Sequence, residues 1–384
     1  MQTPKGKILL YVTNSINFFV AHKISLALTA KQNGFSIHIA APEEKSFDAS
    51  REKRFIFHPI PLGRKTISPW KEFRTILSLY RLYKKLQPDL IHHLTIKPMI
   101  YGSLAVQFLR LKPYVINAVT GLGYVFVGKT FRSKILRKIV IPTYCLAFRL
   151  KNYTVIFQNP DDQEFFLNKK ITQRKNTVLI KGSGVNMAQF PLLPMAQGTP
   201  VVMMISRMLW DKGVGEFWES AQQLKSENVL ARFVLVGDTD DGNPSAVPSK
   251  QLQSWVESGI IEWWGYRKDM PQVLAEAHIV CLPSYREGIP RCLIEAASCG
   301  RPLITTNEPG CREVVHDGIN GYLIPSRNSK ILADKLKVLL SNPTLREKMG
   351  YLGRDLIKKE FSEEIVLTKT LAIYSGNHLF KSLG

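Results

Sequence analysis

The sequence lacks acidic residues over a long stretch of its first half. No Asp or Glu occurs between Asp89 and Asp161, and residues 1–186 contain 30 Lys and Arg against 9 Asp and Glu. Residues 187–384 contain 22 of each kind, so the formal net charge of +21 is confined to one half of the chain. Such one-sided charge indicates an anionic partner, which can be a nucleic acid, a membrane surface or a phosphorylated substrate.

Cysteine and long hydrophobic runs are also scarce. The five cysteines form no Cys-x-x-Cys pair, which argues against a zinc site or a disulfide framework and for a reducing compartment. The longest strongly apolar stretch, Ile139–Phe148, is about half as long as a membrane-spanning helix. The apolar run after Lys5 is broken at Thr13–Ser15, which favours a first β-strand over a signal peptide. We therefore expect a chain that does not cross a membrane.

Short apolar runs alternate with amphipathic stretches along all 384 residues. This length suits two domains, and strand–helix alternation predicts parallel sheets covered on both faces. The expected strands are Lys7–Thr13, Ser36–Ala40, Asp89–His93, Tyr114–Val119, Thr154–Gln158, Val201–Ile205, Arg232–Val236, Ile260–Trp263, His278–Leu282 and Pro302–Thr305. The expected helices are Ala21–Asn33, Trp70–Leu86, Gly213–Lys225, Cys292–Cys299 and Lys330–Leu340.

The two halves meet in a stretch rich in Gly and Pro, Gly182–Pro200, where the charge balance also changes. We expect a basic, membrane-facing domain over residues 1–185, a second domain over 186–358 and a last segment over 359–384. Two doubly wound, Rossmann-like domains that face each other bind ligands at the carboxyl ends of their strands, in the cleft between them.

The most specific constellation, Glu287-Gly-Ile-Pro-Arg-Cys-Leu-Ile-Glu295, follows the expected strand that ends at Leu282. Gly288 lets the backbone approach a ligand, and Pro290 suits the first turn of a helix, whose free N–H groups attract a phosphate. Glu295 would point to nearly the same side as Glu287. The alternative is two surface glutamates, but Glu295 lies among apolar residues, where an unpaired carboxylate is costly.

A second constellation, Ser206–Gly213, follows the expected strand Val201–Ile205 and contains Arg207 and Lys212. Two cations at the carboxyl end of a strand suit a diphosphate, because a departing diphosphate needs its developing charge neutralised. The alternative is a solvated loop with ordinary basic residues, and this segment alone does not choose between the two.

Together the two constellations resemble the retaining nucleotide-sugar glycosyltransferases of family four, which have the GT-B fold. The marks of that family are a Glu-x7-Glu element and an upstream Arg and Lys. The resemblance implies that Arg207 and Lys212 hold the donor diphosphate, that Glu287 contacts the transferred sugar and that Glu295 contacts the ribose. Further matches are Gly300–Thr306, Pro309–Val315 and Asp317–Gly321. The donor-binding residues so implied are Arg207, Lys212, Gly265, Tyr266, Arg267, Glu287, Gly288, Ile289, Arg291 and Glu295.

In the first half, His92–Pro98 and Asn117–Tyr124 resemble bacterial transferases that extend lipid-diphosphate-linked glycans, some of which add N-acetylhexosamine to an undecaprenyl-diphosphate sugar. Many of those relatives have a His where this chain has Val119-Thr120, and His93 is the nearest candidate for its catalytic role. The loop Thr13–Phe19 is not rich in glycine, which is a second departure. The expected acceptor-binding residues are His22, which with Lys23 would open a helix, and His93, Lys97, Thr120 and Gly121.

Two other patterns in the basic half need weighing. Gly123–Thr130 satisfies the P-loop spacing, but its Tyr, Val and Phe residues resist the positive φ angles that a phosphate loop needs. Val125–Lys151 carries seven basic residues and no acid beside an apolar side, which suits either an interfacial helix on anionic lipid or a core helix with a solvated face.

The sequence therefore predicts a metal-independent, retaining transferase without a cofactor that moves a hexose or N-acetylhexosamine from a UDP-sugar to a polyprenyl-diphosphate glycan. We expect a monomer, peripherally associated with the cytoplasmic face of the cell membrane, whose last helix, Phe361–Leu379, crosses back to the first domain by resemblance. A P-loop hydrolase or kinase and a basic nucleic-acid-binding protein are the alternatives. No recognised nucleic-acid module occurs in the basic half, so we expect no nucleic-acid partner.

Overall fold

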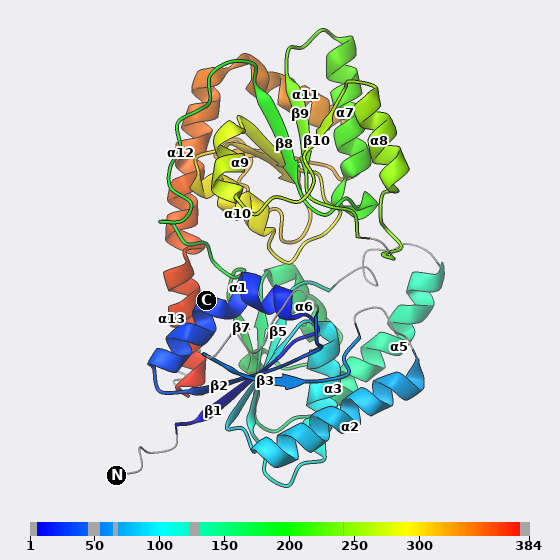
Figure 1. Ribbon diagram of the computed structural model, residues 1–384, viewed down its shortest axis with the longest axis vertical. Coiled ribbons are helices and arrows are strands. Elements are labelled where there is room, and N and C mark those ends of the chain that lie inside the picture. Colours follow the sequence, from blue (N-terminus) through cyan, green and yellow to red (C-terminus); the bar gives the residue numbers. More distant parts are fainter. Residues whose placement is uncertain (1–5, 45–53, 64–67, 123–130, 241, 377–384) are drawn as a thin grey trace. The chain divides into compact units, whose positions relative to one another are not determined.

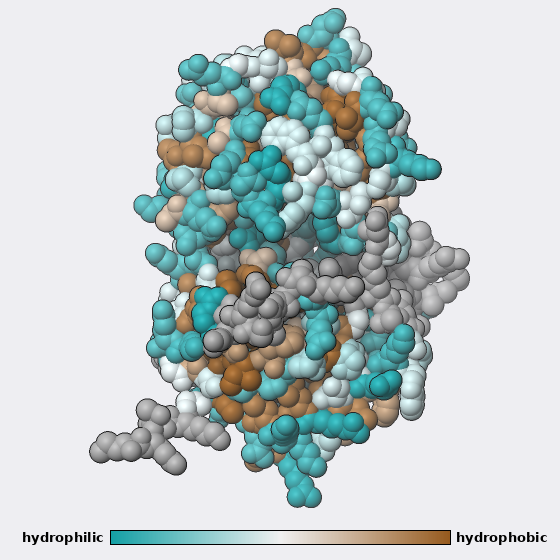
Figure 2. Space-filling view, viewed as in Figure 1, coloured by the Kyte–Doolittle hydropathy of each residue, from teal (hydrophilic) through white to brown (hydrophobic). Residues whose placement is uncertain are grey.

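A computed structural model describes residues 6–44, 54–63, 68–122, 131–240 and 242–376, without the side chains of residues 131–137 and 139. The chain divides into two compact units, each built on its own parallel sheet (Figure 1). Unit 1 comprises residues 1–180 and 367–384, and unit 2 comprises residues 181–366. Hydrophilic and hydrophobic residues are intermixed on the visible face of each unit (Figure 2).

Unit 1 contains a seven-stranded parallel sheet in the order β3-β2-β1-β4-β5-β6-β7. Its strands are β1 (Ile8–Val12), β2 (Ser36–Ala41), β3 (Ile56–Pro59), β4 (Leu90–Leu94), β5 (Tyr114–Val119), β6 (Tyr153–Phe157) and β7 (Thr177–Leu179). Its helices are α1 (Ile16–Gln32), α2 (Pro69–Leu86), α3 (Ile96–Gln107), α5 (Phe131–Ala147), α6 (Pro160–Asn168) and most of α13 (Glu363–Tyr374). A 3-10 turn spans Arg174–Asn176.

Strand alternation sends neighbouring side chains of β4 into opposite layers, because successive residues of a strand point to opposite faces. His92 contacts Tyr374 of α13 on one face of the sheet, while His93 contacts Tyr83 of α2 on the other. All five residues of β4 are buried, as expected for a central strand covered on both faces.

Unit 2 contains a six-stranded parallel sheet in the order β10-β9-β8-β11-β12-β13. Its strands are β8 (Val201–Ile205), β9 (Arg232–Val236), β10 (Glu262–Trp263), β11 (Ile279–Leu282), β12 (Leu303–Thr306) and β13 (Gly321–Ile324). Its helices are α7 (Val214–Ser226), α8 (Ser249–Glu257), α9 (Met270–Glu276), α10 (Arg291–Ser298), α11 (Ser329–Ser341) and α12 (Pro343–Glu360), with a 3-10 turn at Trp210–Lys212. α7 packs against α11 and α10 against α12.

Each sheet therefore has the doubly wound strand order, in which the first strand of the unit lies beside the fourth rather than at an edge. In unit 1 the strand order reverses between β1 and β4, and in unit 2 it reverses between β8 and β11. Loops on either side of such a switch point diverge and leave room for a ligand at the carboxyl ends of the strands.

Candidate active site

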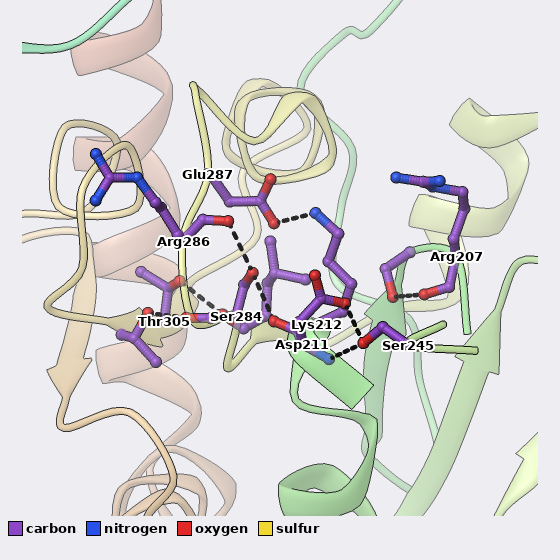
Figure 3. Close-up of polar contacts among 11 residues, drawn as sticks. Arg207, Asp211, Lys212, Ser245, Ser284, Arg286, Glu287 and Thr305 are labelled. Carbon is purple, nitrogen blue, oxygen red and sulfur yellow. Dashed lines mark hydrogen bonds and ion pairs between the residues drawn. The ribbon is translucent and has the colours of Figure 1, made fainter. Parts of the chain in front are cut away.

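The switch point of unit 2 lies between β8 and β11, which are hydrogen-bonded neighbours. Arg207 and Lys212 follow β8, and Glu287 follows β11. Figure 3 shows the guanidinium of Arg207, the ammonium of Lys212 and the carboxylate of Glu287 pointing to the same side of these loops. The two constellations of the sequence thus meet at one edge of one sheet.

Lys212 and Glu287 form an ion pair with 2.5 Å between Nζ and Oε1 (Figure 3). Their side chains keep only 18% and 14% of their surface exposed, so the pair is well shielded from water. Burial lowers the pKa of Lys212, but the Glu287 carboxylate more than offsets this, and the pKa of Lys212 ends above its usual value. The ammonium therefore keeps its positive charge throughout the neutral pH range.

The backbone around this pair is fixed by close contacts that only glycine permits. Gly213 has φ of 82° and ends the 3-10 turn that carries Lys212; a Cβ there would lie 2.3 Å from Pro283 O. Gly310 has φ of 80°, and a Cβ there would lie 2.1 Å from Gly288 O. The Glu287 amide donates to Pro309 O at 3.1 Å. The loops after β8, β11 and β12 are thereby tied together.

Ser284 and Asp211 supply further ties between the β8 and β11 loops. The hydroxyl of Ser284 donates to Asp211 O at 3.2 Å, and the Tyr285 amide donates to the same oxygen at 2.9 Å. The hydroxyl of Ser245 donates to the Asp211 carboxylate at 3.0 Å. Preorganised loops of this kind fix the backbone positions of Lys212 and Glu287 before a ligand arrives.

Arg207 lies at the open side of the site, where its guanidinium is half exposed. It forms an ion pair of 2.5 Å with Asp240, which follows β9. The adjacent Ser206 amide donates to Val236 O at 3.0 Å, and a Cβ on Gly237 would clash with Ser206 O. This arrangement presents a second cation beside Lys212, as a diphosphate requires.

Glu295 is buried in α10 and is paired with Arg291 one turn earlier, at 2.6 Å from Nε to Oε1. Burial raises the pKa of Glu295 and the Arg291 guanidinium opposes that rise. Two residues that we expected to contact the donor separately are therefore partners of each other. Because α10 begins at Arg291, Glu287 lies in the preceding loop and not on the same helix as Glu295.

The remaining residues expected at the donor site follow β10 or adjoin Glu287. The Gly237 amide donates to Gly265 O at 2.7 Å, and the Tyr266 amide donates to Asp238 Oδ1 at 3.0 Å. Arg267 binds Asp269 through two hydrogen bonds, and its guanidinium lies over the ring of Trp264. Ile289 packs within unit 2 beside Gly182.

At the switch point of unit 1, Lys97 lies in the first turn of α3. Its ammonium pairs with Glu72 of α2 at 2.8 Å and donates to Gly63 O at 2.9 Å. Sequence reasoning missed Glu72, although it is the only acid between residues 53 and 88. The pair holds Lys97 at the carboxyl edge of the sheet, where an acceptor anion would compete with Glu72 for it.

Thr95 links β4 to α3 in a conformation that is unfavourable for a β-branched residue, with φ of 76° and ψ of 169°. Its hydroxyl oxygen is buried and has no hydrogen-bond partner among the described residues. Backbone strain of this kind clusters at functional sites. Thr95 was not among our expected residues, since no sequence pattern marks a strained φ.

Thr120 and Gly121 follow β5 and are half-buried; Gly121 has φ of 120°. The ring of His22 packs on Phe18 at a tilt, with 4.6 Å between the ring centroids. The position of His22 corrects our expectation that it opens a helix. α1 begins at Ile16, because Ser15 caps it by accepting a hydrogen bond from the Phe18 amide. His22 consequently lies almost two turns inside α1, and most of the expected loop Thr13–Phe19 is helical.

His93 is fully buried between the sheet and helices α2 and α3, and it does not lie at a ligand-binding surface. Its Nδ1 donates to Asn117 Oδ1 at 2.8 Å and its Nε2 accepts from the Tyr83 hydroxyl at 3.0 Å. A Cβ on Gly102 would lie 2.1 Å from Nε2, so α3 closes over the ring. Burial lowers the pKa of His93 to about 4, which keeps it neutral. This position corrects the expectation that His93 contacts substrate, because the side chain at the end of β4 points into the core.

The remaining expectations concern the P-loop-like segment, the basic segment, the cysteines, metal sites and membrane-spanning helices. The P-loop-like segment Gly123–Thr130 lies outside the described residues, and of the basic segment 125–151 the structure gives the helix α5, which contains Pro142. All five cysteines are free thiols. Within the described ranges no cluster of three or more His, Cys, Asp or Glu has a geometry suited to a metal ion, and no helix has the length and hydropathy to span a membrane.

Two family models match the chain, one in each unit. A model described as glycosyl transferase 4-like matches residues 7–159, and a model described as glycosyl transferases group 1 matches residues 199–342. Together the two models leave unmatched residues 1–6, residues 160–198, which include α6 and β7, and residues 343–384, which include the last helices.

Curated relatives match most of the chain. An N,N'-diacetylbacillosaminyl-diphospho-undecaprenol alpha-1,3-N-acetylgalactosaminyltransferase of Campylobacter jejuni is 29% identical over 352 residues, which are 88% of this chain and 90% of the relative. A UDP-Gal:alpha-D-GlcNAc-diphosphoundecaprenol alpha-1,3-galactosyltransferase of Escherichia coli is 24% identical over 278 residues, which are 69% of this chain and 70% of the relative.

Solved structures share the fold over nearly the whole chain. A sucrose-phosphate synthase of Thermosynechococcus elongatus has a TM-score of 0.80 at 16% identity and covers 96% of this chain and 98% of its own. HepE of Anabaena, solved in complex with UDP-glucose, has a TM-score of 0.77 at 17% identity, with 96% and 99% covered. At this identity the likeness concerns the fold: two α/β domains with parallel sheets.

Proposed function

Since this chain belongs to the group 1, GT4-like glycosyltransferases and has their GT-B fold, we propose that it transfers a sugar from a UDP-sugar to a polyprenyl-diphosphate-linked glycan with retention of anomeric configuration. The observation that carries the proposal is the shielded Lys212–Glu287 pair at the switch point of unit 2. The transferred unit is a hexose or an N-acetylhexosamine.

In the proposed reaction the bond between C1 of the sugar and the diphosphate oxygen breaks, and a new bond forms from C1 to an acceptor hydroxyl. The proton of that hydroxyl passes to an oxygen of the departing diphosphate. Negative charge develops on the departing diphosphate, and Lys212 and Arg207 stabilise it. No metal is needed, because these two cations supply the neutralising charge. Glu287 holds the hydroxyls of the transferred sugar, and Glu295 holds the ribose of the nucleotide.

In the empty site, ion pairs hold the charged side chains in position before the donor binds. Lys212 is held by Glu287, Arg207 by Asp240, and Arg291 by Glu295. When the diphosphate binds, its oxygens replace Glu287 as the partner of Lys212 and Asp240 as the partner of Arg207. The released Glu287 carboxylate turns to sugar hydroxyls. Preformed pairs of this kind avoid an uncompensated buried charge in the empty site.

The acceptor belongs to unit 1, in our proposal. Two relatives are named as enzymes that act on undecaprenyl-diphosphate-linked sugars, and this supports the same class of acceptor here. Lys97, Thr120, Gly121 and His22 are the residues that we propose for contacts with the acceptor. The basic composition of the first half suits a diphosphate and an anionic surface. We propose that the protein is a monomer and that it associates peripherally with the cytoplasmic face of the cell membrane.

The first experiment measures nucleotide release from a panel of UDP- and GDP-sugars, with and without a short polyprenyl-diphosphate sugar, for the wild type and Glu287→Gln. We expect acceptor-dependent release from one UDP-sugar and a loss of roughly 100- to 1000-fold in kcat for the variant. Nuclear magnetic resonance of the product then reports the anomeric configuration.

Glu227→Gln is the matched control, since Glu227 also pairs with a lysine, Lys337, but on the surface of unit 2 away from the β8 and β11 loops. It should leave turnover unchanged. ATP hydrolysis that disappears in Lys129→Ala and persists in Glu287→Gln, with no sugar transfer, would overturn the proposal in favour of a P-loop enzyme.

A further inference from the structure

The outward face of helix α2 combines exposed aromatic and basic side chains. Along it, Trp70, Phe73, Leu77, Arg81 and Lys84 follow one another at spacings of three or four residues, which places them on one side of the helix. The opposite side, with Thr75, Leu79 and Tyr83, is buried against the sheet and α3. The helix spans 18 residues, about 27 Å, so this face is long.

The first turn of this face exposes two large aromatic residues. Trp70 is 68% and Phe73 is 54% exposed, and their rings stack with 6.0 Å between centroids. Large apolar side chains gathered at the surface indicate contact with an apolar partner, whereas single ones do not. Trp in particular favours the boundary between hydrocarbon and water.

The rest of the face is basic. Arg74, Arg81 and Lys84 are exposed, as are Lys71 and Lys85 at its border. The helix has one acid, Glu72, and this residue points inward to its ion pair with Lys97. Every charge that α2 presents to solvent is therefore positive.

The face continues beyond the helix into the segment that connects α3 and β5. Tyr80 and Lys84 share a groove of about 740 Å³ with Phe108, Arg110 and Leu111. Phe108 is 73% and Leu111 is 68% exposed. Over the position that α2 has in Figure 1, Figure 2 shows hydrophilic and hydrophobic residues intermixed. We call Trp70, Phe73, Arg74, Arg81, Lys84, Phe108, Arg110 and Leu111 the α2 surface.

We propose that the α2 surface is where unit 1 docks on a bilayer that contains anionic phospholipid. Aromatic and aliphatic side chains enter the interface while the cations contact lipid phosphates, which is the combination that holds an amphipathic helix in the plane of a membrane. Charge complementarity decides for this occupant, because exposed cations continue along the same face of the helix as the apolar residues. A nucleic acid would use the cations but would leave the exposed Leu111 without a role.

The position of Trp70 and Phe73 within unit 1 relates membrane docking to acceptor binding. This step rests on the proposed function. Glu72 lies between Trp70 and Phe73 in the same turn and binds Lys97, a proposed acceptor contact. A polyprenyl acceptor stays in the bilayer, so its diphosphate lies at the depth of the lipid phosphates. Docking through the α2 surface brings the carboxyl edge of the unit 1 sheet to that depth.

The test compares binding of the full chain to vesicles of phosphatidylcholine alone and to vesicles of phosphatidylcholine with phosphatidylglycerol in a three-to-one ratio, each at low and at high salt. Wild type should bind only the second kind well. Arg74→Gln/Arg81→Gln/Lys84→Gln should weaken that binding roughly fivefold per cation removed, about 100-fold in all. Trp70→Ala/Phe73→Ala should weaken it roughly tenfold or more at either salt concentration, since apolar insertion is not screened.

Matched variants on unit 2 control for the loss of charge and of apolar surface. Lys330→Gln/Lys348→Gln/Lys358→Gln removes three exposed cations, and Leu230→Ala/Tyr351→Ala removes two exposed apolar side chains. Both should bind vesicles as wild type does. Equal vesicle binding by the wild type and both α2 variants would overturn the proposal. The proposal would also be overturned if neither the wild type nor any variant bound vesicles, and if the wild type bound duplex DNA while the α2 charge variant did not.

A second measurement separates this inference from the reaction. The α2 variants should transfer sugar to a short, water-soluble acceptor at the wild-type rate and lose transfer to a long-chain acceptor in vesicles by the same factor as vesicle binding. Vesicle binding that depends on the α2 surface without any sugar transfer would contradict the proposed function and leave the docking surface in place. A loss of transfer to both acceptors alike would contradict the docking role.

Discussion

Lys23 is a cation placed in the interior of unit 1, about two turns into α1 and close to His92. Only 7% of its surface is exposed, and burial lowers its pKa from 10.5 to about 8. Its charge also helps to lower the pKa of His92, after burial of that ring. A buried amine that has lost part of its basicity destabilises the folded state at neutral pH.

The pKa of Lys23 predicts that unit 1 becomes more stable as the pH rises above 8. Between about pH 8 and pH 10 the folded lysine is neutral while the unfolded one is charged, so the unfolded chain binds more protons and the free energy of unfolding rises by up to about 3 kcal/mol. Denaturant titrations across this range should show the rise for wild type. Lys23→Met should be more stable at pH 7 and nearly flat, whereas Lys31→Met, an exposed residue of the same helix, should keep the wild-type slope.

Whether the position of a single residue could be predicted depends on its place relative to the end of a strand. Arg207, Lys212 and Glu287 lie at one edge of the sheet, as predicted, because each follows a strand whose end was predicted correctly and parallel strands bring such loops together. His93 was assigned wrongly because the strand continues to Leu94, so His93 lies within β4 and its side chain points to the face that α2 and α3 cover. The ion partners Asp240 and Glu72 could not be predicted, since they come from separate elements.

At the scale of elements, strands were predicted more faithfully than helices. β5, β8 and β9 have the predicted bounds, because buried parallel strands are short apolar runs with clear ends. α3 was missed since seven of its twelve residues are buried and none is exposed, which leaves no polar face to mark a helical period. β3 was missed for the opposite reason: it is a half-exposed strand at the edge of the sheet.

The contact between the loops after β11 and β12 predicts that Gly310→Ala impairs catalysis. The new Cβ would lie 2.1 Å from Gly288 O and 2.6 Å from Glu287 O, so the loop that carries Glu287 must move. Displacement of a catalytic group by about 1 Å costs roughly 100-fold in kcat. Steady-state kinetics with the donor found in the nucleotide-release panel would measure this loss.

Gly318→Ala is the control for backbone strain. Gly318 has φ of 74°, close to the 80° of Gly310, but nothing lies within 4 Å of its Cβ position. Its substitution should cost about 1 kcal/mol of stability and leave kcat unchanged. Equal effects on kcat at both positions would mean that strain alone, and not the loop contact, explains the loss.

At the scale of the whole molecule, the last described helix completes the core of the first unit. Tyr374 of α13 is buried, and its hydroxyl lies 2.7 Å from His92 Nδ1 and 3.0 Å from the Tyr11 hydroxyl. Its ring also packs on Phe35. The sequence placed a helix here from the family resemblance and not from a pattern, since a contact between residues 11 and 374 leaves no local signal.

Tyr374→Ala should destabilise unit 1 by about 3–5 kcal/mol, because it opens a cavity and leaves His92 and Tyr11 without their partner. Hydrogen–deuterium exchange should show faster exchange in β1 and β4 and unchanged exchange in β8 and β11. Tyr374→Phe, which keeps the ring, should lose only about 1–3 kcal/mol. Uniform loss of protection in both units after Tyr374→Ala would mean that the two units unfold as one.

Because Tyr374 belongs to the core of unit 1, unit 2 can complete its folding before unit 1 during translation. A ribosome releases residues 6–180 long before it reaches residue 374, so the nascent first unit waits with Tyr11 of β1 and His92 of β4 lacking the part of their cover that Tyr374 supplies. Unit 2 is continuous from residue 181 to 366 and can fold as soon as it emerges. The segment translated first is therefore the one that matures last, and a chain arrested before α13 would expose the faces of β1 and β4 to chaperones and proteases.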